Sequence, residues 1–210
     1  LLVGPFLWEI SLSLKGTGDN VYAVPPYLVP KTPTFDNYLQ VFRQVPVFKY
    51  MLNTLIVAVI SIAGNVIFSA MAGYALGRLK WHGRGFVFAL FMASMVIPLE
   101  GVMISQFLII RTVHLQNTLL AVALPGLCGA INILLMTNAF KAIPAELEEA
   151  AMVDGANLWQ RFFRVCLPQV KGTMTVVGIF AFVGAWNDFL WPLIVVSDES
   201  KYTLTLGMNR

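Results

Sequence analysis

Residues 52–75 read LNTLIVAVISIAGNVIFSAMAGYA, and no charged residue lies anywhere between Lys49 and Arg78. A helix of roughly 20 apolar residues is long enough to cross the hydrocarbon core of a bilayer, which is about 30 Å thick. This stretch is therefore predicted to be a membrane-spanning helix.

Three further stretches have the same character. The stretch 86–109 contains a single charged residue, Glu100, and 118–140 contains none. The stretch 172–196 is interrupted by charge only at Asp188. Four such runs in one chain predict an all-α membrane protein, a polytopic bundle of transmembrane helices.

The composition supports this class and argues against others. Hydrophobic residues make up 58% of the chain and charged residues 12%, about half of the roughly 25% found in soluble domains. The net charge is +3, but the basic residues form short clusters between apolar runs rather than one patch, so nucleic acid is not expected as a partner. Cys128 and Cys166 are expected at different membrane depths, which argues against a disulfide between them.

The short connections predict the orientation of the spans. Positive charge is concentrated in 77–85 and 141–171, and two spans separate these connections, so both are predicted to be cytoplasmic. Segments 15–50, 111–117 and 197–203 then lie on the outer side. Segment 15–50 also contains four basic residues, but they are spread over a longer stretch.

The ends of the chain have a different character. Residues 1–14 are apolar but too short to span, and we interpret them as the outer end of a truncated first helix. A signal peptide is the alternative, but it would need a basic n-region and a small-residue cleavage site. The C-terminal end at Arg210 is interpreted as truncated too.

The outer segment 15–50 is too rich in proline to form one continuous helix. Within it, apolar residues recur at helical spacing, with Thr34 placed as a possible N-cap: Phe35, Tyr38, Leu39, Phe42 and Val45. This pattern predicts an amphipathic helix, lying either at the membrane surface or against the bundle.

Residues 143–171 read IPAELEEAAMVDGANLWQRFFRVCLPQVK. Pro144 is predicted at the first helical position, and Gly155 at the left-handed residue that ends this first helix. Asn157 is predicted to cap a second helix, which Pro168 would end. The aromatic and small residues of this helix–turn–helix suit docking against another protein, but packing beneath its own bundle would explain them equally well.

A resemblance favours docking. The run Glu149-Ala150-Ala151, three residues, Gly155, nine residues and then 165–168 (VCLP) resembles the EAA motif of permeases in ATP-binding-cassette (ABC) importers. The family pattern has Ile where this chain has Val165. In that family the loop is a coupling helix seated in a groove of the ATPase subunit. The resemblance implies that 143–168 contacts an ATPase through these positions: Glu149, Ala150, Ala151, Asp154, Gly155, Leu167 and Pro168.

The rest of the chain is similar to the maltose-type, carbohydrate-importing branch of these permeases. The stretches that show this are SLSLK at 11–15, TFDNY at 34–38, AGYALGRLKWHGR at 72–84 and AWNDFLWPLIV at 185–195. The resemblance implies a six-span family fold, of which 1–210 is one transmembrane domain that covers about five spans, with the first truncated and the last absent.

The resemblance also implies an assembly. Its expected members are a second permease subunit, two ATPase subunits that bind ATP and Mg, and an extracytoplasmic sugar-binding protein, all at a prokaryotic plasma membrane. The alternatives are the same machinery serving glycerol phosphate or another small solute, or an ion-coupled transporter that uses Glu100 and Asp188. The EAA spacing argues against the ion-coupled alternative.

Polar residues inside the predicted spans are candidates for the substrate pathway, because burying them in lipid is costly. Amides and carboxylates beside aromatic rings suit sugar hydroxyls, and the candidates are Glu100, Asn132, Trp186, Asn187 and Asp188, with Trp191 nearby. Hydrogen bonding between helices or a place in an interfacial aromatic belt would also explain them.

The sequence contains no pattern typical of catalysis. It has no GxxxxGK[ST] phosphate loop, so we expect no cofactor in this chain and place ATP on another subunit. His82 and His114 have no neighbouring ligand residues, so no metal site is expected. The chain is predicted not to be an enzyme.

Overall fold

The computed structural model describes residues 3–209 except residues 24 and 26, and these residues form helices with no β-strand. The predicted all-α class is confirmed. The chain divides into two compact units, one ending at Lys49 and the other beginning at Tyr50.

The first unit contains α1 (Gly4–Ser13) and α2 (Asp36–Gln44). The loop between them folds around the carboxylate of Asp19, which accepts hydrogen bonds from the backbone N–H groups of Lys31 and Thr32, at 3.1 and 3.2 Å. These hydrogen bonds hold Lys31 and Thr32 against Asp19, which lies near the start of the loop.

Helix α2 confirms the helix predicted in the outer segment. Its capping residue is Phe35 rather than Thr34, so the predicted N-cap is wrong by one residue. The hydroxyl of Thr34 nevertheless accepts the N–H of Asp36, at 3.1 Å. Of the predicted segment 1–14, residues 1–2 lie outside the described residues.

Among the described helices, α3 (Val47–Gly77) alone is long and apolar enough to cross a membrane by itself. Two pairs of helices could also cross if each pair counts as one broken span. They are Leu119–Gly126 with Ala130–Lys141, bent by 50°, and Leu158–Gln169 with Lys171–Asn187, bent by 79°.

The predicted span 86–109 consists of two helices. Helix α4 (Arg84–Ser94) and α5 (Leu99–Thr112) are separated by residues 95–98. Pro98 is the residue immediately before α5, and its fixed backbone and missing N–H explain why the helix breaks here.

The other two predicted spans are also interrupted, which a charge-free pattern alone does not reveal. They comprise α6 (Leu119–Ala123), η1 (Leu124–Gly126) and α7 (Ala130–Lys141), and then α11 (Lys171–Asn187) and α12 (Leu190–Val195). Uninterrupted helices are therefore the wrong expectation here. Pro192 explains one break, because it has no N–H to donate to the carbonyl of Asp188, the C-cap residue that follows α11.

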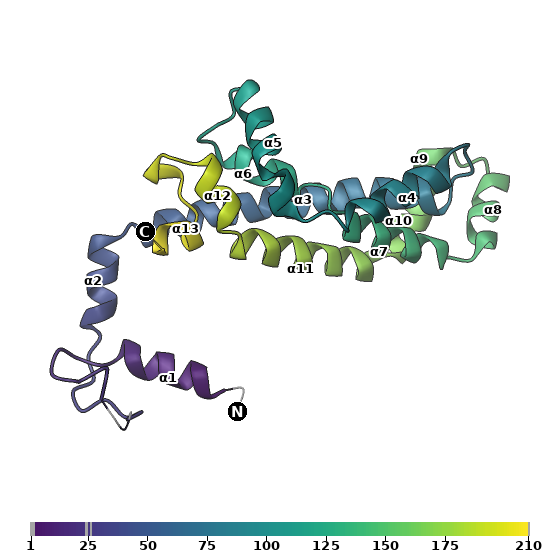
Figure 1. Ribbon diagram of the computed structural model, residues 1–210. Coiled ribbons are helices and arrows are strands. Elements are labelled where there is room, and N and C mark those ends of the chain that lie inside the picture. The colour runs from purple at the N-terminus through teal and green to yellow at the C-terminus, as the bar shows by residue number, and fades with distance from the viewer. Residues whose placement is uncertain (1–2, 24, 26, 210) are drawn as a thin grey trace. The chain divides into compact units, whose positions relative to one another are not determined.

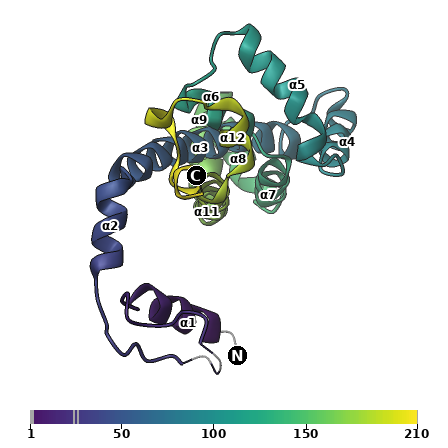
Figure 2. The ribbon, with the colours of Figure 1, turned by 60° about the vertical axis from the view of Figure 1, so that its left-hand side comes forward.

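Helices α7 and α11 pack along α3, as the views in Figures 1 and 2 show. Ser69, Gly73 and Gly77 place small residues four apart on α3, a spacing that lets helix backbones approach closely. A Cβ atom added to Gly73 would lie 2.6 Å from Cβ of Met136 on α7. The two helices could not pack this closely if Gly73 had a side chain.

The core of the second unit joins these helices to the loop that contains the EAA-like motif. It consists of Ala70, Tyr74, Met136, Phe140, Ile143, Phe162, Cys166, Val170 and Val177. The loop comprises α8 (Ala145–Val153), α9 (Leu158–Gln160), the π-helix η2 (Arg161–Cys166) and α10 (Leu167–Gln169).

Two local predictions for this loop need correction. Pro144 lies at the capping position before α8 rather than at its first helical residue. Pro168 does not end the second helix, which continues to Gln169. The π-helical turn η2 runs directly into α10, so Pro168 lies in the first turn of α10, near the end of a continuous helical segment.

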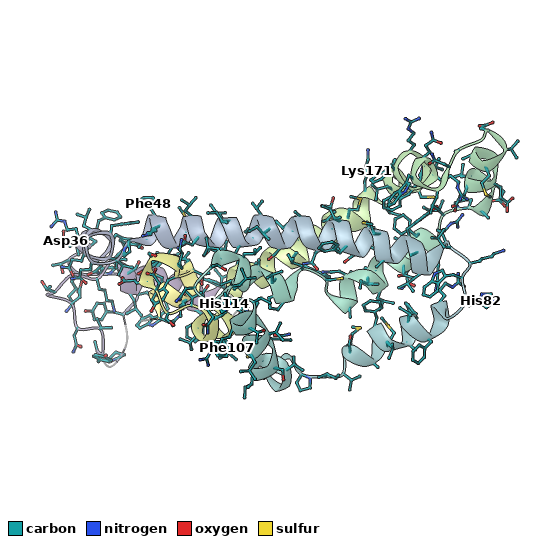
Figure 3. The ribbon with its side chains drawn as sticks, turned by 90° about the horizontal axis from the view of Figure 1, so that it is seen from above. Asp36, Phe48, His82, Phe107, His114 and Lys171 are labelled. Carbon is teal, nitrogen blue, oxygen red and sulfur yellow. The ribbon has the colours of Figure 1, made fainter. Side chains whose placement is uncertain are left out.

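Both basic connections lie toward the same end of α3. In Figure 3, His82 and Lys171 lie toward one end of that helix, and His114 lies toward the other. This agrees with the predicted topology, whereas the side of the membrane on which each end lies stays a prediction. The end of α3 toward which His114 lies is also where η3 (Glu199–Lys201) and α13 (Leu204–Met208) are found.

Candidate functional site

The turn between α8 and α9 is built as the sequence predicts. Gly155 has φ of +78°, a left-handed conformation in which side chains are strained. Asn157 then caps α9 by accepting the N–H of Gln160, at 2.9 Å, while the Gln160 side chain accepts the N–H of Asn157, at 2.8 Å. This reciprocal capping box fixes the angle at which the chain enters the second helix.

The EAA-like residues lie mostly on the surface of this loop. Glu149, Ala150, Asp154, Gly155 and Pro168 are exposed, and the two remaining positions, Ala151 and Leu167, are half-buried. Nothing lies within 4 Å of a Cβ atom added to Gly155. The turn is therefore open to a partner.

A shallow hollow of about 310 Å³ lies beside this turn. It is lined by Ala151, Asp154, Gly155, Ala156, Gln160, Arg164 and Val165. The hollow combines small residues with one acidic and one basic side chain, so a protein surface could approach closely and form ion pairs. Three residues implied by the motif, Ala151, Asp154 and Gly155, are thus brought to one place.

The glutamate that precedes the motif, Glu148, has the opposite environment. Its side chain is 9% exposed and accepts a hydrogen bond from the hydroxyl of Tyr74, at 2.6 Å. The Nε of Arg78 donates to the same carboxylate at 2.8 Å, and Arg161 from η2 lies 3.4 Å away. Arg78 also donates to the carbonyl of Ile143, at 2.8 Å.

These contacts keep Glu148 charged. Burial by itself raises the pKa of Glu148, but the hydrogen bonds from Tyr74 and Arg78 and the charges of Arg78 and Arg161 outweigh it and hold the pKa below its ordinary value. A carboxylate with several donors and two guanidinium groups is the stable form of this cluster.

Sequence reasoning missed this cluster. Tyr74 and Arg78 are four residues apart and so share one face of α3, which was the available signal. Their acceptor, however, is 70 residues away from Arg78 in the chain. The EAA spacing singles out Glu149, but no local signal predicts that Glu148 is buried and Glu149 exposed.

A second candidate site is a polar cavity of about 440 Å³ within the second unit. Its lining includes Ser61, Asn65, Gln106, Asn132, Asn187, Asp188 and Trp191, together with apolar residues. The cavity thus combines amides, a hydroxyl, a carboxylate and an aromatic side chain. Small-molecule sites have this character, in which a few polar groups converge within an apolar wall.

Two asparagines organise one wall of this cavity. The side-chain oxygen of Asn65 accepts hydrogen bonds from the side chain of Asn132, at 2.8 Å, and from the backbone of Gly129, at 3.2 Å. Asn65 also donates to the carbonyl of Gly126, at 2.5 Å, so it bridges the break between η1 and α7. Among the described residues, the buried Oδ1 of Asn132 has no hydrogen-bond partner.

The structure separates the candidate pathway residues into two groups. Asn132, Asn187 and Asp188 line the cavity with Trp191, whose indole N–H donates to the carbonyl of Ala121, at 3.1 Å. Glu100 and Trp186 do not line it. Glu100 is exposed in the first turn of α5, and Trp186 packs against Phe182.

A family model described as the inner-membrane component of binding-protein-dependent transport systems matches residues 34–209. The chain belongs to this family. It is an importer permease, and because the family consists of transport permeases, the prediction that the chain is not an enzyme is confirmed. The resemblance stated from the EAA-like motif is confirmed as well.

Individual relatives agree with the family. This permease is 31% identical, over 99% of its own length and 69% of the relative, to the diacetylchitobiose uptake system permease protein NgcG of Streptomyces coelicolor. It is 31% identical to the lactose transport system permease protein LacG of Rhizobium radiobacter, over 100% of this chain and 76% of LacG.

The fold is also found among solved structures. The permease is similar to a chain of a bacterial ABC transporter involved in the import of the acidic polysaccharide alginate, with a TM-score of 0.86 and 26% identity. The match covers 98% of this permease and 72% of that chain. The predicted helical permease fold is thereby confirmed.

Proposed function

We propose that this permease forms part of the pathway by which an ATP-driven importer takes up a carbohydrate, and that 143–168 seats it on a separate ATPase subunit. The observation that supports docking is the exposed turn at Glu149–Gly155 beside its hollow. Residues 1–210 then belong to one transmembrane domain, in which the loop is the contact with the ATPase.

The family, whose members work in binding-protein-dependent transport systems, supports a proposed assembly. The permease pairs with a second permease subunit and two ATPase subunits, and a sugar-binding protein delivers the solute from outside. The complex lies in the plasma membrane of a prokaryote, which this chain crosses several times. The ATPase subunits, rather than this chain, hold ATP and Mg.

Carbohydrate is the substrate class that the polar cavity suits best. Sugar hydroxyls both donate and accept hydrogen bonds, which the amides of Asn132 and Asn187 can match. Asp188 offers a further acceptor, and Trp191 offers an aromatic neighbour. The relatives named for lactose and diacetylchitobiose support the same class.

The experiment that tests docking uses the full-length permease in its complete complex, reconstituted in vesicles. Glu149→Lys reverses a charge on the exposed turn, and Gly155→Trp fills its open side. Both variants are expected to insert normally, to lose the ATPase subunit on purification and to lose ATP-driven uptake. Normal ATP-driven uptake in both, with the ATPase subunit retained, would contradict the proposal that 143–168 is the docking surface.

The experiment that tests the substrate class compares labelled lactose and diacetylchitobiose with labelled glycerol phosphate. Asn187→Ala removes a cavity amide that makes no contact with the loop, and loss of one such hydrogen bond is expected to lower sugar uptake about tenfold. The ATPase subunit should stay bound. Uptake of glycerol phosphate but of neither sugar would contradict the carbohydrate assignment.

A further inference from the structure

Glu148 and Glu149 are consecutive in the sequence but face different surroundings. Glu148 is buried in the cluster with Tyr74, Arg78 and Arg161, whereas Glu149 is exposed at the turn. On the short helix α8, the carboxylate of Glu149 is therefore open to a partner, whereas that of the preceding Glu148 lies inside the permease.

The buried carboxylate joins three segments of the chain. Tyr74 lies in the last turn of α3, and Arg78 directly follows that helix. Arg161 is the first residue of the π-helix η2. Because Arg78 also binds the carbonyl of Ile143, the connection that enters α8 is held by the same guanidinium. The loop is therefore fastened to α3 at both its entrance and its first helix.

Aromatic side chains pack around the contacts that Glu148 makes with Tyr74, Arg78 and Arg161, which together are called the joint. The Tyr74 ring centre lies 5.5 Å from that of Phe140 and 5.0 Å from that of Phe162. Breaking a buried ion pair from one side leaves an uncompensated charge in such surroundings, which is strongly unfavourable. The joint therefore resists sliding of the loop against α3.

Helix α3 continues from this joint to the polar cavity. Its residues Val57, Ser61 and Asn65 line the cavity, and Arg78 follows Asn65 by 13 positions, a separation of about 20 Å along a helix. A displacement of the loop that is transmitted to α3 would therefore reach the wall of the cavity.

We propose that Glu148 is a positioning residue that locks the docking loop to the end of α3, so that movement imposed by the ATPase moves this helix and the cavity wall. The inference rests on the proposed docking function of 143–168. It assigns a second role to the loop: Glu149 contacts the partner, and Glu148 passes the movement into the bundle.

The test measures whether α3 still responds to ATP when the joint is weakened. The reporter is Ser61→Cys on the cavity wall, in the full-length complex, with the exposed Cys128 replaced by Ser and the buried Cys166 retained. The rate of labelling by N-ethylmaleimide is compared with and without MgATP. Glu148→Gln keeps the size of the side chain and removes its charge.

With Glu148 intact, MgATP is expected to change the labelling rate of the reporter by at least about fivefold, the lower end of typical allosteric couplings. In Glu148→Gln the ATPase should remain bound and hydrolyse ATP, while this change falls below about twofold, because the loop is no longer locked to the end of α3. Glu146→Gln, an exposed neighbour on α8, is the matched control and should behave as the unaltered protein.

Three results would overturn the proposal. The first is the full ATP-dependent change in Glu148→Gln, and the second is no change even with Glu148 intact. The third is a proportional fall of ATPase binding, hydrolysis and labelling change together, which would mean that Glu148 only maintains the fold. Failure of the docking function is a separate result, because Glu149→Lys would then retain the ATPase.

Discussion

The two ends of α3 are fastened to the rest of the second unit by different chemistry. At the loop end, Arg78 forms an ion pair with the buried carboxylate of Glu148, supported by Arg161. At the opposite end, the amide of Asn53 donates to the backbone carbonyls of Ser200 and Tyr202, at 3.1 and 2.8 Å. One end relies on opposite charges and the other mainly on neutral groups.

The two kinds of contact differ in the free energy that is lost when one partner is removed. A buried ion pair that loses one partner leaves a buried charge without compensation, so the loss of stability is large. A neutral side chain bonded to backbone carbonyls can be lost at a smaller cost, because the net free energy of each such bond is modest. The contact at the loop end of α3 is therefore the more costly one to break. This suits the end at which we propose that the ATPase acts on the permease.

The largest expected effect comes from breaking the charged joint. Arg78→Met leaves Glu148 buried beside Arg161 alone and should lower the free energy of unfolding by about 3–5 kcal/mol. The double variant Arg78→Met with Glu148→Leu removes both charges of the pair and should recover most of that loss. Thermal unfolding of the purified permease in detergent measures both; a double variant no more stable than Arg78→Met would contradict the ion-pair account.

A steric change tests the opposite end. A Cβ atom added at Gly207 on α13 would collide with the ring of Tyr50, so Gly207→Ala should destabilise the fold by about 2 kcal/mol. Gly172→Ala on α11 is the control, because nothing lies within 4 Å of its added Cβ. The same unfolding measurement should show the control unchanged or slightly stabilised, and no loss of stability in Gly207→Ala would contradict close packing of Gly207 against Tyr50.

Removing the neutral contact should have a smaller effect. Asn53→Ala deletes two hydrogen bonds to backbone carbonyls and is expected to cost about 1.5 kcal/mol. Unfolding of this variant beside Arg78→Met compares the two ends directly. A greater loss for Asn53→Ala than for Arg78→Met would contradict the assignment of the loop end as the more costly contact to break.

The smallest effect is a dependence on pH that belongs to the loop end. The pKa of Glu148 lies below its ordinary value of 4.5 in the folded permease. Its contribution to stability is therefore complete above the unfolded pKa and is lost as the pH falls through the folded pKa. The difference in melting temperature between the unaltered permease and Glu148→Gln should shrink as the pH falls below 4.5, whereas a constant difference would show that the charge contributes nothing.

Local signals in the sequence predicted a large part of this structure. The charge-free run 52–75 lies within α3, Gly155 adopts the left-handed conformation and Asn157 caps the next helix. Each of these follows from residues that are neighbours in the chain. The turn at Gly155 was predictable for the same reason.

Features that depend on distant residues were not predictable. The burial of Glu148 is set by Tyr74 and Arg78, which arrive from α3. The polar cavity likewise selects Asn132 and leaves out Glu100, although both lie in apolar runs. Hydropathy shows that a polar group is inside a span but not which way its helix turns it.

The most direct test of the docking assignment compares the two ends of the permease by photo-crosslinking in the complete complex. A benzophenone amino acid replaces Ala150 at the docking turn or, as the control, Val113 toward the opposite end, where both side chains are exposed. We expect the ATPase subunit to be crosslinked from position 150 and not from position 113. A crosslink to the ATPase from 113, or its absence from 150, would contradict the assignment of 143–168 as the surface that binds the ATPase.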